Sequence, residues 1–168
     1  WQGFFDPDTT PLDPVSGMGK PYATFAYATH VAEVAVDTLT GEVQVLRVSA
    51  AHDVGKAINP ENVRGQIYGG VVMGLGFALM EEFEPGKTES LKDYHIPTCA
   101  DIPEIVPIIV EDFEPTGPFG AKGVGEPALI PTAPAILNAI SDALGSRIYK
   151  LPANLERVLA AAILSKES

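Results

Sequence analysis

The sequence predicts an α+β fold, in which a hairpin and short strands form a mixed sheet packed by a glycine-rich helix and C-terminal helices. Three observations predict it. Two strand-like segments flank a turn sequence, a long glycine-rich apolar segment carries helix-start signals, and an amphipathic segment closes the chain. The chain has 168 residues, of which 46% are apolar and 20% charged, enough for one globular domain with a sizeable core. We expect an irregular segment over residues 1–21 and a single domain over residues 22–168.

The strands are expected mainly in the first half of the chain. Thr24–Asp37 alternates in places and is rich in small and β-branched residues, which favours a strand. The turn sequence TLTGE follows it, and Glu42–Val54 has the composition of a partner strand, so the two segments predict a hairpin. Another short strand is expected over Ile105–Asp112, after a polar linker.

A long helix is expected to begin at Pro60 and to run to about Glu82. Asn59 is a good N-cap, proline suits the first helical position, and Glu61 favours the positive end of the helix dipole.

This helix contains glycines at positions 65, 69, 70, 74 and 76, each of which lowers helix propensity by about 1 kcal/mol. Gly65 and Gly69 share one face, and so do Gly70 and Gly74. The helix therefore packs closely either against the sheet or against a ligand, and the spacing alone allows both.

The C-terminal part is predicted to be mainly helical. Residues 127–145 favour a helix that is interrupted early by Pro131 and Pro134 and capped by Gly145. RIYK, residues 147–150, is compatible with a short strand, and residues 153–166 form an amphipathic closing helix.

Composition excludes several classes of partner. The formal net charge is −11 and no Lys/Arg cluster interrupts it, so no nucleic acid is expected. The most apolar run, Gln66–Met80, is too short to cross a membrane, and no membrane association is expected. The lone Cys99 is expected to be buried and cannot form an internal disulfide, which favours a reducing, cytoplasmic compartment. The chain starts at Trp1 without a secretory signal, as expected for a piece of a larger protein.

The histidines show no metal-binding spacing. His30, His52 and His95 lie far apart in the sequence, so we expect structural or surface roles and assign no metal ligand.

The segment GPFGAKGVGEP, residues 117–127, places Lys122 and Glu126 among glycines. Glycine is used where φ is positive or where the backbone must approach another group, so this segment is either a tight turn or a cradle for a ligand. It matches neither the P-loop nor the dinucleotide pattern. Taken locally, Glu126 is also compatible with a helix N-terminal residue that complements the helix dipole.

Four segments taken together, in order, give a specific resemblance: residues 53–82 (DVGKAINPENVRGQIYGGVVMGLGFALMEE), 94–104 (YHIPTCADIPE), 117–145 and 147–159 (RIYKLPANLERVL). The chain resembles the xanthine dehydrogenase and aldehyde oxidase family of molybdopterin hydroxylases. The match is to the C-terminal part of the molybdenum-binding subunit, and it runs from about Tyr22 to Leu159.

The resemblance implies roles for particular residues. Glu126 matches the glutamate of the family's KGxGE segment, which is the catalytic base beside the molybdenum. Lys122, Gly123, Val124 and Gly125 match the residues before it, where the glycines let the backbone approach the cofactor. Outside this loop, Gln66 in VRGQI matches a glutamine that hydrogen-bonds the pterin.

The resemblance also implies cofactors and partners. The cofactor is molybdenum-molybdopterin, with or without a dinucleotide extension, and iron–sulfur clusters and FAD are expected on partner subunits or domains. The remaining part of the molybdenum-binding subunit is expected to complete the pocket for a small-molecule substrate, either an N-heterocycle or an aldehyde. The alternative is an isolated or truncated domain with a structural or binding role and no activity of its own.

Overall fold

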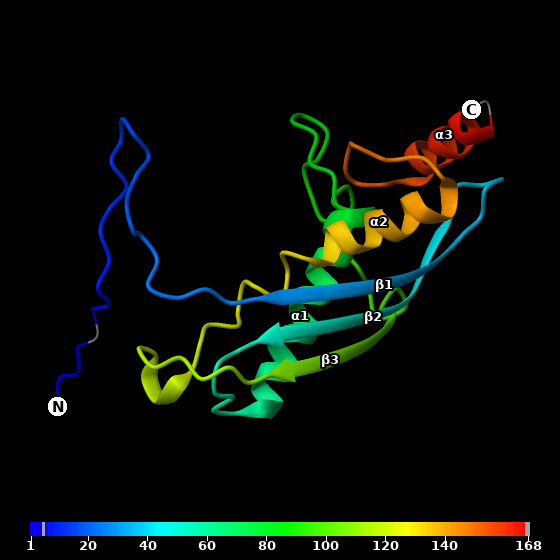
Figure 1. Ribbon diagram of the computed structural model, residues 1–168. Coiled ribbons are helices and arrows are strands. Elements are labelled where there is room, and N and C mark those ends of the chain that lie inside the picture. Colours follow the sequence, from blue (N-terminus) through cyan, green and yellow to red (C-terminus); the bar gives the residue numbers. More distant parts are fainter. Residues whose placement is uncertain (5, 167–168) are drawn as a thin grey trace.

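The computed structural model describes residues 1–4 and 6–166. In chain order the elements are β1 (Ala28–Val36), β2 (Val43–Asp53), α1 (Pro60–Leu79), β3 (Glu104–Val110), the 3₁₀ helix η1 (Pro118–Gly120), α2 (Thr132–Leu144) and α3 (Leu155–Lys166). The strands form one sheet in the order β1-β2-β3, and α1 and α2 pack on it (Figure 1). The predicted α+β class is confirmed.

The sheet is mixed, as predicted. β1 pairs with β2 antiparallel, and β3 pairs with β2 parallel. In β1 the inward positions alternate regularly from His30 to Val36. In β2 the pairing shifts opposite Glu33 and Val34, which leaves Leu46 as the extra residue of a β-bulge. The bulge resets the alternation, so Val48, Ala50 and His52 all face the core.

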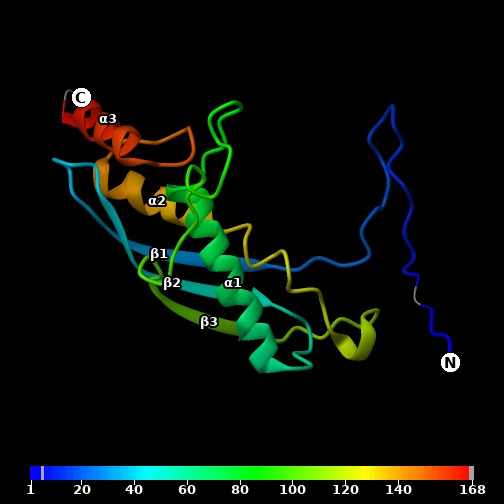
Figure 2. The ribbon, with the colours of Figure 1, turned by 180° about the vertical axis from the view of Figure 1, so that it is seen from behind.

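Helix α1 crosses one face of the sheet (Figure 2). The side-chain oxygen of Asn59 accepts a hydrogen bond of 3.1 Å from the Asn62 N–H, which confirms the predicted N-cap. The helix ends at Leu79, slightly before the predicted end, where the N–H groups of Met80 and Glu81 both bond to the Gly76 carbonyl. Its core face is a helical stripe of buried residues: Val63, Ile67, Gly70, Val71, Gly74, Leu75 and Ala78.

Two C-terminal predictions need correction. Helix α2 starts only at Thr132, because residues 125–130 form turns, and Pro134 then falls in the first helical turn, where its missing N–H costs little. The RIYK segment, residues 147–150, forms no strand and instead runs beside α2 toward α3. The C-cap prediction is confirmed, since Gly145 adopts a left-handed φ of 69°.

Cys99 also differs from the expectation, because it is exposed. It lies in the polar segment between α1 and β3, which is folded into turns and packs little against the core. Residues 1–4 and 6–21 extend away from the sheet (Figures 1 and 2). Where the domain begins within that stretch stays a prediction. Within residues 1–4 and 6–166, no helix is both long and apolar enough to span a bilayer.

Candidate functional site

The glycine-rich loop is fastened to the segment that leaves β2. Gly55 and Ala121 form an isolated β-bridge, in which the Lys122 N–H donates to the Val54 carbonyl at 2.8 Å. The Lys56 N–H donates to the Gly120 carbonyl at 2.7 Å. Gly55 has a φ of 60° and lies directly against the loop backbone, so any side chain there would collide with the loop. These contacts place residues 120–122 beside the start of α1.

A buried ion pair also fixes the loop to the end of β2. The Lys122 ammonium donates a hydrogen bond of 2.5 Å to Asp53, and these two side chains are only 5% and 7% exposed. Burial alone raises the pKa of Asp53, but hydrogen bonds from Lys122 and from the Gly55 N–H, together with the lysine charge, lower the net value below 3.8. The pKa of Lys122 is raised, chiefly by its bond to Asp53. The ammonium therefore points into the protein.

The remaining loop residues reach the surface. Gly123, Gly125 and Glu126 are exposed, whereas Val124 is half-buried and packs against the hydrophobic core. Glu126 begins a turn in which its carbonyl accepts a hydrogen bond of 3.0 Å from the Leu129 N–H. The loop is thus anchored through Lys122 and Val124 and presents the glutamate on its outer side.

Gln66 lies on the exposed side of α1, next to this loop. Its Oε1 atom is 3.7 Å from the point where a Cβ of Gly125 would stand. A cavity of about 220 Å³ separates the start of α1 from the loop, and Asn59, Gln66, Lys122 and Val124 are among the residues that line it. The fold therefore brings together the glutamine and the loop, which are far apart in the sequence.

The helix glycines divide into two groups. A Cβ on Gly70 would meet the backbone of Ala128 at 2.7 Å, and one on Gly74 would meet Thr132, so these two glycines allow close helix packing. Gly65 and Gly69 have nothing within 4 Å of such a Cβ. Gly70 and Gly74 therefore pack against the turn and helix at residues 128 and 132, not against the sheet, whereas contact of a ligand with the open space beside Gly65 and Gly69 stays a prediction.

A polar cluster that the sequence did not predict lies at the start of α2, six residues after Glu126. His30 of β1 and His52 of β2 face each other with 2.6 Å between their Nε2 atoms, and Thr132 Oγ1 lies 3.0 Å from His30 Nδ1. Thr132 and His52 are almost fully buried. Strand alternation in the sequence could have placed His30 inward, but nothing in it showed that the two histidines meet.

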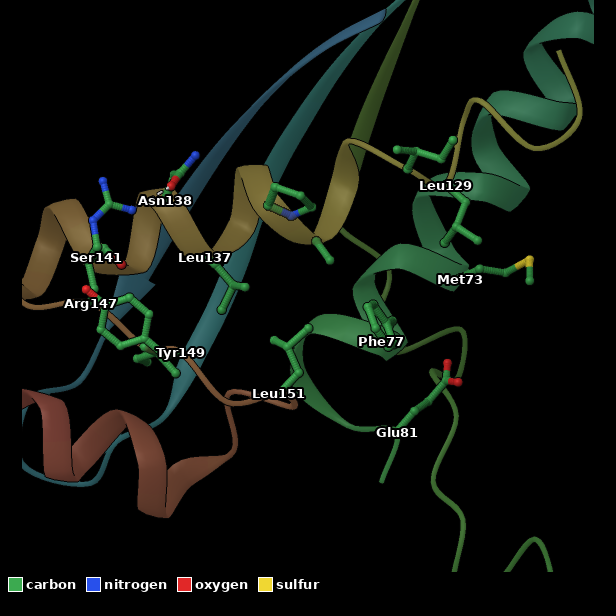
Figure 3. A pocket seen from close by; sticks show the side chains of 14 residues that line it. Met73, Phe77, Glu81, Leu129, Leu137, Asn138, Ser141, Arg147, Tyr149 and Leu151 are labelled. Atoms are coloured by element: carbon green, nitrogen blue, oxygen red, sulfur yellow. Dashed lines mark hydrogen bonds between the residues drawn. The ribbon is translucent and has the colours of Figure 1, made fainter. Parts of the chain in front are cut away.

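An apolar pocket of about 620 Å³ lies elsewhere, between α1, α2 and residues 147–151 (Figure 3). Met73 and Phe77 line it from α1, Leu137 from α2, and Tyr149 and Leu151 from the following segment. Neither Gln66 nor any residue of the loop from 122 to 126 lines this pocket. It is a second feature of the surface, separate from the predicted cofactor side.

Comparisons with known proteins agree with the resemblance. A family model described as a molybdopterin cofactor-binding domain matches residues 1–103. The aldehyde oxidoreductase of Megalodesulfovibrio gigas is 44% identical over 154 residues, which are 90% of this chain and 17% of that protein. A probable xanthine dehydrogenase subunit from Bacillus subtilis is 40% identical over 161 residues, 94% of this chain and 21% of that protein.

A solved structure shows the same fold. The aldehyde oxidoreductase from Desulfovibrio gigas aligns with a TM-score of 0.88 and 41% identity, over 92% of this chain and 17% of that one. The chain spans about one fifth of the length of the curated relatives named above. Since the family model covers more than half of the chain, the chain belongs to the molybdopterin cofactor-binding domain family.

Proposed function

We propose that this chain is the C-terminal portion of the molybdenum-binding subunit of a molybdopterin hydroxylase, in which Glu126 is the catalytic base. The substrate we propose is a small N-heterocycle or an aldehyde. When bound, the molybdenum cofactor would supply the two-electron oxidation by which oxygen from water is added to an electron-poor carbon. Glu126 would take up the proton released in that step at a carboxylate oxygen, as a general base.

The observation that carries this proposal is the proximity of Gln66 to the glutamate loop: its Oε1 atom lies 3.7 Å from the position that a Cβ of Gly125 would occupy. The residues present also suit a flat, polar cofactor. The open space beside Gly65, Gly69 and Gly123 is free of protein atoms within 4 Å of a Cβ position, so backbone is accessible there. The Gln66 amide can both donate to and accept from a heterocycle edge.

Lys122 and Val124 contribute to this site through the position of their backbone. The Lys122 ammonium is engaged by buried Asp53, and Val124 packs against the core, so both side chains hold the loop in place. The cofactor contacts that we propose for residues 122–125 are therefore made by main-chain groups, which the glycines leave uncovered.

The partners we propose follow from the share of the relatives that this chain represents. Four fifths of each curated relative lie outside the matched region. The pocket at Met73, Phe77 and Tyr149 exposes these large apolar side chains to solvent, which a partner surface would cover. We propose that the remaining part of the molybdenum-binding subunit covers it. Iron–sulfur and FAD subunits, and a cytoplasmic location, remain parts of the proposal.

Replacing Glu126 by glutamine in the complete molybdenum-binding subunit tests the assignment. The amide keeps the size of the side chain but cannot accept the proton, so turnover should fall about 10²–10⁴-fold at full molybdenum loading. Glu156→Gln is the matched control, because Glu156 is an exposed acidic residue in the first turn of α3 and lies outside the site. If Glu126→Gln turns over within a few-fold of the control, Glu126 is an exposed carboxylate of the turn before α2 and not the base.

Metal analysis separates this proposal from the alternative of an inactive domain. The complete subunit purified from its native source should contain molybdenum and pterin in stoichiometric amounts. A complete subunit that contains neither molybdenum nor pterin would favour a structural or binding role.

A further inference from the structure

The polar cluster of His30, His52 and Thr132 connects four elements, and two of its members, His52 and Thr132, are buried. Thr132, at the start of α2, is fully buried, and its hydroxyl lies 3.2 Å from the Ala128 carbonyl and 3.0 Å from His30 Nδ1. His30 comes from β1 and contacts His52 of β2. On the other side Gly74 of α1 leaves the space that the Thr132 side chain fills.

The direction of these hydrogen bonds follows from what each group can donate. The Thr132 hydroxyl has one proton, and the Ala128 carbonyl receives no backbone N–H from the described residues, so the hydroxyl donates to it. The hydroxyl oxygen must then accept from His30 Nδ1–H. Neutral His30 consequently accepts at Nε2, and the His52 Nε2–H is its donor.

Other observations support a neutral hydrogen-bonded pair. Burial, and then the charge of His52, lower the pKa of His30 to about 4, and burial lowers the pKa of His52. The rings meet edge to face at 83°. The Nε2 atoms, 2.6 Å apart, are too close to share a zinc ion, since two nitrogens about 2.0–2.1 Å from a tetrahedral ion lie more than about 3 Å apart.

The cluster acts on the turn that carries Glu126. Ala128 is two residues after Glu126, and the same turn is closed by the bond of 3.0 Å from the Leu129 N–H to the Glu126 carbonyl. Fixing the Ala128 carbonyl therefore fixes the plane of the peptide that joins Ala128 to Leu129 and the direction in which the turn leaves the core. Gly70 touches the other side of Ala128, so the turn is held between the helix and the hydroxyl.

From this geometry, and resting on the proposed function, we infer that Thr132 is a positioning residue for Glu126, and that the His30–His52 pair orients the Thr132 hydroxyl. Among the described residues, the Thr132 hydroxyl is hydrogen-bonded to His30 and to the Ala128 carbonyl, and not to Glu126. Its effect passes through the Ala128 carbonyl, which holds the turn in one orientation. A base displaced by about 1 Å can lose about 10²-fold in rate, so this hydroxyl matters for turnover without entering the chemistry.

Two substitutions at Thr132 separate positioning from packing. Thr132→Val keeps the shape and the contact with Gly74 but loses the hydroxyl, whereas Thr132→Ser keeps the hydroxyl and loses the methyl group. In the complete subunit at full molybdenum loading, Thr132→Val should lower kcat by about 10–100-fold with KM changed less than about 2-fold. Thr132→Ser should retain kcat within about 3-fold of the parent. A merely structural role predicts the opposite order, in which Thr132→Ser has a lower kcat than Thr132→Val.

The double variant provides the second readout. If Thr132 acts through Glu126, adding Thr132→Val to Glu126→Gln should change kcat by less than about 3-fold, because the misplaced group no longer accepts a proton. Multiplying effects in the double variant, or parental kcat in Thr132→Val, would overturn the inference.

These results are distinguishable from failure of the proposed function, which is shown by Glu126→Gln alone retaining turnover. If Thr132→Val does not fold, the same test can be made at His52, which contacts Thr132 through His30, by comparing His52→Leu with His52→Gln. Glutamine replaces the Nε2–H donor and should retain kcat within about 3-fold of the parent, whereas leucine should lower it. Equal kcat for the two variants would overturn the role of the pair.

Discussion

The helix glycines give a prediction in which neighbouring substitutions have opposite signs. Gly69 and Gly70 are adjacent in α1, yet a Cβ at Gly69 meets nothing within 4 Å, and one at Gly70 would lie 2.5 Å from Ala128 Cβ and 2.7 Å from its carbonyl carbon. Carbon atoms pack best at about 3.5–4.0 Å, so Gly70→Ala requires the 128–129 backbone to move by about 1 Å. No rotamer change relieves this contact, because it involves main-chain atoms.

The expected difference in stability between the two variants follows from helix propensity and from overpacking. Replacing glycine by alanine in a helix adds about 1 kcal/mol of stability at either position. Overpacking at Gly70 costs about 1–3 kcal/mol, and Gly69 has no such cost. The helix term cancels between the variants, so Gly69→Ala should be more stable than Gly70→Ala by about 1–3 kcal/mol. For a chain of 168 residues this is a difference in Tm of about 2–12 °C.

The assay is thermal unfolding of both variants and the parent, followed by circular dichroism at matched concentration. Gly69→Ala should unfold above the parent and Gly70→Ala below Gly69→Ala. Equal midpoints, or Gly70→Ala as the more stable variant, would refute the close approach of α1 to Ala128. In the complete subunit, Gly69→Ala should also lower pterin content although it stabilises the fold, since the added methyl occupies the space proposed for the cofactor.

The remaining predictions concern the cofactor contact, acid stability and completeness of the pocket. Gln66→Leu in the complete subunit should leave polar cofactor atoms unpaired at a cost of about 1–3 kcal/mol, measured as lower pterin occupancy at unchanged Tm, and parental occupancy would return Gln66 to a packing role. His30 has its pKa lowered from 6.5 to about 4 in the fold, so its contribution to stability is complete above pH 6.5 and is lost as the pH falls toward 4. That shift corresponds to roughly 3 kcal/mol at most, at 1.36 kcal/mol per pH unit. Urea unfolding at pH 7 and pH 4.5 measures this loss in the free energy of unfolding. The control variant His95→Gln should lose as much stability as the parent between the two pH values, and His30→Gln should lose less. Asp53 affects the pH dependence of stability only at lower pH. Because its pKa is lowered in the fold, its contribution to stability is complete above about pH 3.8 and is lost as the pH falls below this value. Purified by itself, the 168-residue chain should bind no molybdopterin, as measured by metal analysis, because under the proposed function it supplies only one side of the pocket; stoichiometric molybdenum would contradict this.

Local sequence determined most of the secondary structure. The Asn59-Pro60-Glu61 helix start, the hairpin turn and the Gly145 cap were predicted because each depends on residues within one or two turns of chain. The errors came where a local pattern had no single outcome. Residues 147–150 have strand-like composition but find no strand partner, and Cys99 belongs to an apolar residue type yet lies in a polar linker.

The candidate site divides in the same way. The motif around Glu126 and the glutamine at position 66 were identified from the sequence, because their residue types and order match the family. Their proximity could not be predicted, because the distance between the loop and α1 depends on tertiary packing and not on a local sequence pattern. Lys122 shows the limit most clearly: its charge among glycines pointed to a ligand, and only the folded chain directs its ammonium to buried Asp53.

The histidines show the physical reason for this division. Alternation along β1 is a property of that strand by itself and is compatible with an inward His30, but in β2 the alternation is interrupted at Leu46, and His52 faces the core only because of that bulge. Whether they meet depends on the register, which pairs His30 with Ala50 and leaves His52 as the diagonal neighbour across the strands. Register is set by the bulge at Leu46 and by packing against α2, and both depend on contacts between residues distant in sequence. The sequence alone therefore determined which residues are present and the face of His30, whereas the tertiary structure decided the face of His52 and which of these residues touch.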